Sequence, residues 1–410
     1  MTIICLLLCS TYSSGQETFT TNHFLAGAEQ QESVVFQNQK LEFLTSISHE
    51  LPMIEKLEFR TETNQLDFRK QEFLLRVSPN SFKNMETQRQ YQTTVKNLTE
   101  LELEETWGKA LRERYDLLVD YIYFKKITAI KNKQEVLFKD KVTLLERSIA
   151  LPGFDVLDLI AAEDEEQQNI RDILDLDNAI KTYEMAIQKM DNTVGPIQIK
   201  ENNLLDITGL KNNLLKIKPM PLADHPQLKV LSAKKYSNML EYEWEVAKSK
   251  FSLGYIQAKY ANDPNDNFRK SISIGIGFEI PLKGAAQLDM NELQIKVFES
   301  ESEYKNREYQ LSGKIYSTYQ RLQNLIKKYD LVNQQLNDSQ AEFALKEYSK
   351  IAEASPQAML KLRENTLKKE LLLQKLELDI MRAYIEYLDY SGLIGQRPYV
   401  NYLSKNMERF

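Results

Sequence analysis

The sequence predicts a mainly α fold with a small β part, built as a tandem repeat of helix, β-hairpin, long helix and return helix. Three observations predict this class. Two long stretches without proline carry apolar residues at every seventh position, which is typical of coiled coils. Pairs of short stretches alternate between apolar and polar residues, which is typical of strands with one wet face. Landmark prolines also recur: Pro79 and Pro281 stand 202 residues apart, and Pro152 and Pro356 stand 204 apart.

Composition limits the kind of protein. Of the 410 residues, 42% are hydrophobic and 27% are charged, so the chain is folded rather than disordered. The net charge is −6 and no basic block is present, so we expect no nucleic-acid partner. Only 13 residues are glycine, which favours long helices over a fold built wholly from strands.

The N-terminal segment reads as a secretory signal peptide covering residues 1–15. An apolar core, Ile3–Cys9, is followed by Ser13-Ser14-Gly15. The alternative is a buried N-terminal segment, since no Lys or Arg precedes the core. Both cysteines lie here, so the remaining chain has neither a disulfide nor a thiolate metal site. Beyond it no apolar run reaches the roughly 18 residues of a membrane helix, so we expect any passage through a membrane to use strands.

Residues 16–191 form the first expected repeat. A helix from His23 to Glu50 opens it, and Pro52 ends that helix. Two alternating, highly charged stretches follow as a hairpin, and Pro152-Gly153 turns the long helix back. The heptad row of the long helix is Tyr123, Ile130, Leu137, Leu144 and Leu151. The expected elements are strands at about 53–61 and 70–78 and helices at about 82–150 and 154–191.

The second half repeats this pattern. Residues 192–224 contain several prolines and form a linker with a small appended element. Residues 225–392 form the second repeat, with Leu322, Leu378 and Ile385 on its heptad rows, and residues 393–410 form a tail. The expected elements are strands at about 251–261 and 268–282 and helices at about 285–351 and 356–391.

The stretch Phe268–Leu282 is the most informative strand. Bulky apolar residues fill one parity, and Ser, Gly and Glu fill the other. A tilted strand of about nine residues can cross a bilayer, so we expect the apolar face to contact lipid. The alternative is a half-buried edge of a soluble domain. The expected lipid-facing residues are Ile272, Ile274, Ile276, Phe278 and Ile280.

Several segments resemble the TolC family of outer-membrane efflux channels. They are His225–Leu228 at the start of a helix, Ser271–Leu282 with its closing Lys283-Gly284, and the hairpin returns Asp155–Leu159 and Ala358–Leu360. The resemblance covers nearly the whole chain after the signal peptide. It rests on the order and spacing of the pieces rather than on any single motif.

The resemblance implies a homotrimer in the cell outer membrane. Each protomer would give four strands to one twelve-stranded barrel in contact with outer-membrane lipid, and the helices would form a periplasmic tunnel. A periplasmic adaptor and an inner-membrane pump are the implied partners. The cost of unpaired backbone groups favours an oligomer independently of the resemblance, because four strands cannot close a barrel and open edges in lipid leave backbone N–H and C=O groups unpaired.

Two features depart from the family. The first hairpin is rich in charge, and Glu55 shares the parity of Leu57, where a carboxylate facing lipid is costly. The helix tips read Leu151-Pro152-Gly153-Phe154 and Glu353-Ala354-Ser355-Pro356, without the Gly-Thr or Gly-Leu element through which family members usually meet their adaptor. A divergent paralogue, either with an unusual partner or with lost transport, is one interpretation.

Candidate site residues are few. His23, His49 and His225 lie far apart and have no companion at a metal-ligand spacing, so we expect no enzyme, metal or cofactor. Asp155 and Asp158 at the first turn and Glu353 at the second are expected to ring the narrow periplasmic end and to select for cations. The alternative role for such residues is helix N-terminal capping.

The favoured function is a passive export duct of a tripartite efflux or secretion system. The first alternative is a soluble periplasmic coiled-coil scaffold or adaptor without a pore, and the second is an enzyme. The row Ile272–Ile280 favours the duct, because in a soluble scaffold five bulky apolar side chains in a row would be exposed to water.

Overall fold

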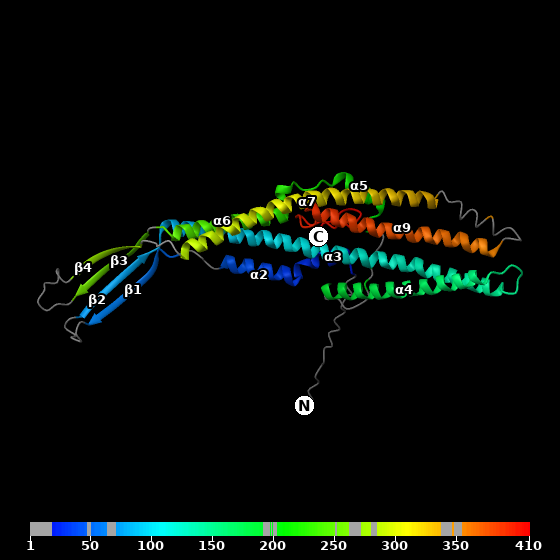
Figure 1. The fold of residues 1–410 in the computed structure, drawn as a ribbon, viewed down its shortest axis with the longest axis horizontal. Helices are drawn as coiled ribbons and strands as arrows, with labels where there is room; N and C mark the ends of the chain where they lie inside the picture. The colour runs from blue at the N-terminus through cyan, green and yellow to red at the C-terminus, as the bar shows by residue number, and fades with distance from the viewer. Residues whose placement is uncertain are drawn as a thin grey trace, which may run out of the picture. The chain divides into compact units, whose positions relative to one another are not determined.

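A computed structural model shows a mainly helical chain with one four-stranded antiparallel sheet, which confirms the expected fold class (Figure 1). The structure describes residues 19–46, 51–63, 71–191, 197, 199, 203–250, 252–261, 272–279, 285–337, 347 and 355–410, with only the backbone described at 252, 285 and 286.

The four strands pair in chain order, β1-β2-β3-β4 (Figure 1). The expected hairpins are both present, and β2 pairs with β3, so the strands of the two sequence halves join into one sheet. The strands are β1 Ile54–Thr63, β2 Gln71–Pro79, β3 Ser252–Ala261 and β4 Ile272–Glu279.

Long helices follow each hairpin, as expected. Ser355 caps the last one by accepting a hydrogen bond from the Ala358 N–H, and a proline at its first position suits a helix start. The main helices are α2 Glu32–Ser46, α3 Phe82–Arg147, α4 Val156–Asp191, α6 Pro226–Lys248, α7 Ala285–Asn337 and α9 Pro356–Tyr390. The part of the outgoing helix expected beyond Asn337 falls almost wholly outside the described residues.

One compact unit contains residues 1–31, 108–219 and 316–410. Its helices neighbour one another in the order α4, α3, α9, α7. The ion pairs that join them are Lys131–Asp172 at 2.7 Å, Asp120–Arg382 at 2.8 Å and Arg321–Glu386 at 2.8 Å. Most members of the heptad rows form the core of this layer: Tyr123, Ile130, Leu137, Leu322, Leu378 and Ile385 are buried, whereas Leu151 is 60% exposed.

The C-terminal tail belongs to the core of the same unit. Tyr115, on α3, donates to the Val400 carbonyl at 2.8 Å and accepts from the Tyr402 N–H at 3.1 Å. Asn401 is fully buried and donates to Asn22 and Thr21. The segment expected as a linker contributes α5, Ile207–Lys216, whose Leu210 is fully buried.

The expected single helix from His23 to Glu50 is wrong. The chain forms α1 Thr21–Ala26, a 3₁₀ turn at Gly27–Gln30 and then α2. The interruption follows from Arg114, whose buried guanidinium donates to the carbonyls of Phe24, Gly27 and Met190. A side chain at position 27 would lie 2.9 Å from this guanidinium, so glycine is what fits there.

The second compact unit contains residues 32–107 and 220–315, including the sheet. Its helices neighbour one another in the order α2, α3, α6, α7. The contacts that join them are Lys40–Glu102 at 2.8 Å, the rings of Tyr91 and Trp244 at 5.8 Å, and Asn238–Ser300 at 2.6 Å. Both units draw on both halves of the sequence, so compact units and sequence repeats divide the chain differently.

Candidate functional site

The sheet has one apolar face that is continuous over all four strands. The register aligns Phe59, Leu75, Ala258 and Ile274 in one cross-strand row, and its neighbours on this face are also mostly apolar. Exposed fractions reach 66% at Phe59 and 77% at Ile274, values unusual for bulky apolar side chains in contiguous rows. The other members of this face are Leu57, Thr61, Phe73, Val77, Ile256, Tyr260, Ile272, Ile276 and Phe278.

This placement puts Ile272, Ile274, Ile276 and Phe278 together on the apolar face, each with more than 40% of its surface exposed. Ile280 lies outside the described residues. Aromatic rings cross the face as well: Phe59 stacks on Phe73 with centroids 6.3 Å apart, and Phe73 on Tyr260 at 6.4 Å.

A β-bulge lies at Glu55. Ile54 pairs with Pro79 and Lys56 pairs with Ser78, so Glu55 is an extra residue without a partner in the register. Odd and even positions of β1 therefore exchange faces at Glu55. Ile54, opposite Pro79, lies on the same face as Leu57, opposite Val77, although one number is even and the other odd. Gly254 holds the equivalent place in β3, between Leu253 and Tyr255. A Cβ there would lie 2.9 Å from the side chain of Glu279, which explains the glycine.

The opposite face of the sheet carries most of the charges of the hairpins, and most of these charges are paired. Lys259 lies 2.6 Å from Glu72, and Arg60 pairs with Glu62. Arg76 lies 3.7 Å from Glu58 and donates to the side-chain oxygen of Gln257 at 3.0 Å. The sheet is therefore apolar on one side and ionic on the other.

The Arg76 guanidinium also lies over the ring of Tyr255, 4.2 Å from its centroid. That ring in turn covers Gly277, where a Cβ would come within 2.3 Å of it. Contacts thus run from β1 to β4 through one arginine and one tyrosine.

Solved structures with a similar fold are outer-membrane proteins. The outer membrane protein VceC from Vibrio cholerae matches with a TM-score of 0.66 and 12% identity, over 91% of this chain and 96% of VceC. The MtrE outer membrane channel of Neisseria gonorrhoeae matches with a TM-score of 0.67 and 10% identity, over 91% and 89%. The CmeC outer membrane channel of Campylobacter jejuni matches with a TM-score of 0.61 and 12% identity, over 91% and 84%.

The chain has the TolC-like fold. The resemblance inferred from the order and spacing of the sequence segments is confirmed at the level of the fold. No protein-family model matches the sequence, and no curated protein is significantly similar to it.

In this TolC-like chain two of the three candidate tip residues, Asp155 and Asp158, lie at the start of α4. Asp155 accepts a hydrogen bond from the Leu157 N–H at 2.9 Å, so it acts as a helix cap. Asp158 lies in the first turn of α4 and is exposed. Glu353 lies outside the described residues. The structure thus gives Asp155 a capping role, and the carboxylate ring stays a prediction.

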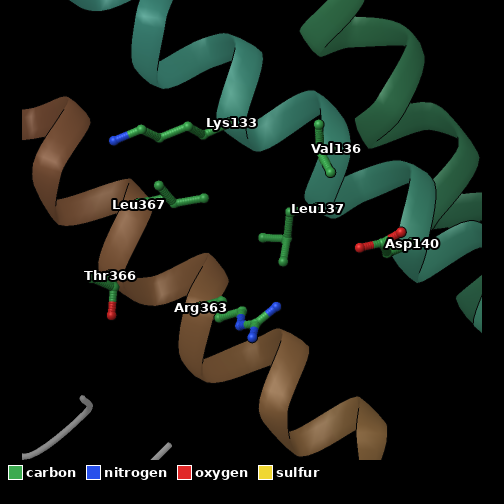
Figure 2. Close-up of a pocket in the computed structure, with 7 residues that line it drawn as sticks. All are labelled: Lys133, Val136, Leu137, Asp140, Arg363, Thr366 and Leu367. Carbon is green, nitrogen blue, oxygen red and sulfur yellow. The ribbon is translucent and has the colours of Figure 1, made fainter.

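A groove of about 250 Å³ lies between α3 and α9 of the TolC-like fold (Figure 2). Leu137 and Leu367 line it, with the charged groups of Lys133, Asp140 and Arg363 around them. Within the described ranges, no three His, Cys, Asp or Glu side chains lie close enough to share a metal ion. None of the helices described combines the length and the apolar composition that a membrane span needs.

Sequence reasoning missed the residues that the register adds to the sheet. Ile256 and Tyr260 of β3 continue the apolar face, and Tyr255 and Gln257 join the ionic one. The alternation of apolar and polar residues in β2 and β3 is visible in the sequence. Only the pairing between strands shows that the apolar residues of all four strands lie on the same face of the sheet.

Proposed function

We propose that this chain is a non-enzymatic outer-membrane channel, a passive export duct from the periplasm to the exterior in a tripartite efflux or secretion system. The observation that carries the proposal is the sheet with one apolar and one ionic face. Such a sheet suits a wall between lipid and an aqueous pore, because strands of membrane barrels alternate between apolar residues outside and polar residues inside.

The energetics of the apolar face support a place in lipid. Burying a bulky apolar side chain contributes roughly 1.5–3 kcal/mol relative to leaving it in water. Ile274, Ile276 and Phe278 alone are 77%, 61% and 60% exposed in the single chain. The outer-membrane channels named above, MtrE and CmeC, share this fold.

Three copies are proposed to build the pore together. β1 and β4 are the outer strands of the sheet, and among the described residues each pairs with another strand on one side only. Open edges are unfavourable in lipid, so neighbouring copies would pair β4 of one with β1 of the next and close a barrel of twelve strands. The helices below would then form the periplasmic tunnel.

Exposed apolar side chains on the helices suit the same assembly. On α7, Leu288, Ile295 and Tyr309 follow a heptad spacing and are 72%, 55% and 82% exposed. On α2, Phe36 and Phe43 stand seven residues apart and are 61% and 57% exposed. Heptad rows of this kind pack against other helices, and a neighbouring copy would supply them.

The tips are the proposed narrow end of the tunnel. Asp158 and Glu353, together with the capping Asp155, would ring the entrance and favour cations. A periplasmic adaptor and an inner-membrane pump would dock there. Conductance measurements on Asp158→Asn test the ring: the proposal expects a weaker cation preference, and an unchanged preference contradicts it.

The competing function is a soluble periplasmic scaffold, and one experiment separates the two. Cells that produce the protein are fractionated, the membrane is extracted with detergent, and intact cells are treated with an amine-reactive cross-linker before extraction. A duct is expected in the outer-membrane fraction as a cross-linked trimer, and the extracted trimer should open conductance steps in planar bilayers. Recovery as a periplasmic monomer without detergent would refute the duct.

A further inference from the structure

We propose that Arg76 and Glu58 together set the ion selectivity of the membrane section, and that Glu58 compensates the charge of Arg76 so that this section adds little preference for anions or cations to that of the tips. The inference rests on the proposed duct, in which the ionic face of the sheet lines the pore. It goes beyond that function by naming the residue pair that sets which solutes pass.

The position of Arg76 makes it suited to this role. The register places Glu58, Arg76, Gln257 and Gly275 in one row that crosses all four strands. Because Gly275 carries no side chain, the row contains one fixed cation, one carboxylate and one amide. Three copies in a closed barrel would turn this row into a ring with three Arg76–Glu58 pairs.

Contacts on two neighbouring strands hold the Arg76 guanidinium in place. Glu58 of β1 lies 3.7 Å from it, Gln257 of β3 accepts at 3.0 Å from Nη2 and 3.4 Å from Nε, and the Tyr255 ring lies 4.2 Å below. A planar guanidinium can serve a carboxylate, an amide and a ring at once, which a lysine cannot do. The other cation near Glu58, Lys56 at 3.6 Å, has a side chain 68% exposed and no second partner among its recorded ion pairs and hydrogen bonds in the described chain.

Charge counting on the described part of this face agrees with compensation. Apart from Glu55 at the bulge, four cations stand against four carboxylates, and cross-strand or near-neighbour pairs join most of them. The eight residues are Lys56, Arg60, Arg76, Lys259, Glu58, Glu62, Glu72 and Glu279. A lining of paired charges discriminates little between anions and cations, because each ion meets both signs at similar distance.

The size of the effect follows from Coulomb's law. An ion about 7 Å from a single uncompensated charge in water is enriched or depleted roughly threefold, and this factor falls as salt is added. Near a pair of opposite charges that compensate each other, the enrichment or depletion of the ion is much smaller.

Reversal potentials across planar bilayers under a low-salt KCl gradient test the inference. The cation-to-anion permeability ratio of the wild type, which also contains the contribution of the proposed tip carboxylates, is the reference. Glu58→Gln should shift the ratio toward anions and Arg76→Gln toward cations, each by about threefold or more. The double variant should return close to the wild type, because both charges are then gone.

Two further variants keep the test informative if a single variant assembles poorly. Arg76→Lys keeps the charge, so its selectivity should match the wild type although the contacts to Gln257 and Tyr255 are lost. The exchange Glu58→Arg with Arg76→Glu keeps the pair and should also match it. Conducting channels whose ratios do not move in opposite directions for the two single variants overturn the role of Arg76. A silent wild type, by contrast, refutes the duct itself.

Discussion

The ammonium group of Lys141 on α3 lies 3.7 Å from the carboxylate of Glu364 on α9. The same ammonium lies 2.6 Å from Glu165 on α4, so one lysine joins three helices of one unit. Glu364 is 1% exposed and also pairs with Lys361 and Lys368. Burial raises the pKa of Glu364, but the hydrogen bond from Lys368 and the charges of Lys141 and Lys361 outweigh it, so the pKa lies below its usual value.

Glu364→Gln is expected to lower the free energy of unfolding by about 1–3 kcal/mol at pH 7, because it removes charge-assisted hydrogen bonds and leaves three lysines facing one another. A lowered folded-state pKa contributes stability above the unfolded value, and this contribution is lost as the pH falls through the folded pKa. The difference from the wild type should therefore shrink below pH ~4.5. Denaturant unfolding followed by circular dichroism checks this. The exposed Glu163→Gln is the control, and an equal loss in both variants would contradict the network.

Arg114→Met is expected to destabilise the unit that holds α1 by about 2–5 kcal/mol. The variant keeps the bulk but leaves the carbonyls of Phe24, Gly27 and Met190 without their donor in a buried place. Limited proteolysis should also cleave earlier around the 3₁₀ turn at Gly27–Gln30. Arg112→Met is the matched control: its partner Asp116 is one helical turn away and 42% exposed, so a loss below about 1 kcal/mol is expected.

Ile274→Arg is expected to reduce the assembled, membrane-inserted fraction strongly. An arginine on the lipid face of a barrel costs about 2–4 kcal/mol near the bilayer midplane. Ser273→Arg places the same charge on the preceding residue of β4, on the ionic face beside Lys259, and should assemble nearly as well as the wild type. Heat-modifiable migration of the trimer in gels measures the assembled fraction. Equal loss in both variants would mean that the two faces are not lipid and water.

Gly277→Ala is expected to cost about 1–3 kcal/mol through overpacking, because its Cβ would meet the Tyr255 ring at 2.3 Å and force it away from Arg76. Gly275→Ala meets only the flexible side chain of Gln257, at 3.0 Å, and should cost less than ~1 kcal/mol. Unfolding temperatures of the two purified variants compare them directly. A milder effect at 277 than at 275 would show that the ring moves freely.

Local patterns were enough to predict most of the fold. The alternation of Ile272–Phe278 and the heptad rows through Tyr123 and Ile385 report which face of each element is apolar, and that depends only on near neighbours in the sequence. The two proline intervals predicted the repeated order of elements. These signals survive because strands and coiled coils bury residues at a fixed period.

Contacts between distant residues explain what could not be predicted. The break between α1 and α2 depends on Arg114, which lies 87 residues from Gly27. The faces of the charged hairpin depend on a bulge at Glu55 that parity alone does not reveal. The Arg76 contacts require the pairing of strands whose contacting residues stand 181 positions apart. Register, bulges and buried arginines are tertiary properties, so no local pattern specifies them.

The shared use of α3 and α7 by both compact units bears on the timing of biosynthesis. Neither unit is complete when the first half of the polypeptide leaves the ribosome. At that point the sheet still lacks β3 and β4, and the other compact unit still lacks α9 and Asn401. Neither nascent half can therefore complete a unit of its own during translation. On the proposed route to the outer membrane, such a delay would keep the polypeptide unfolded enough to pass through a translocase before the strands assemble.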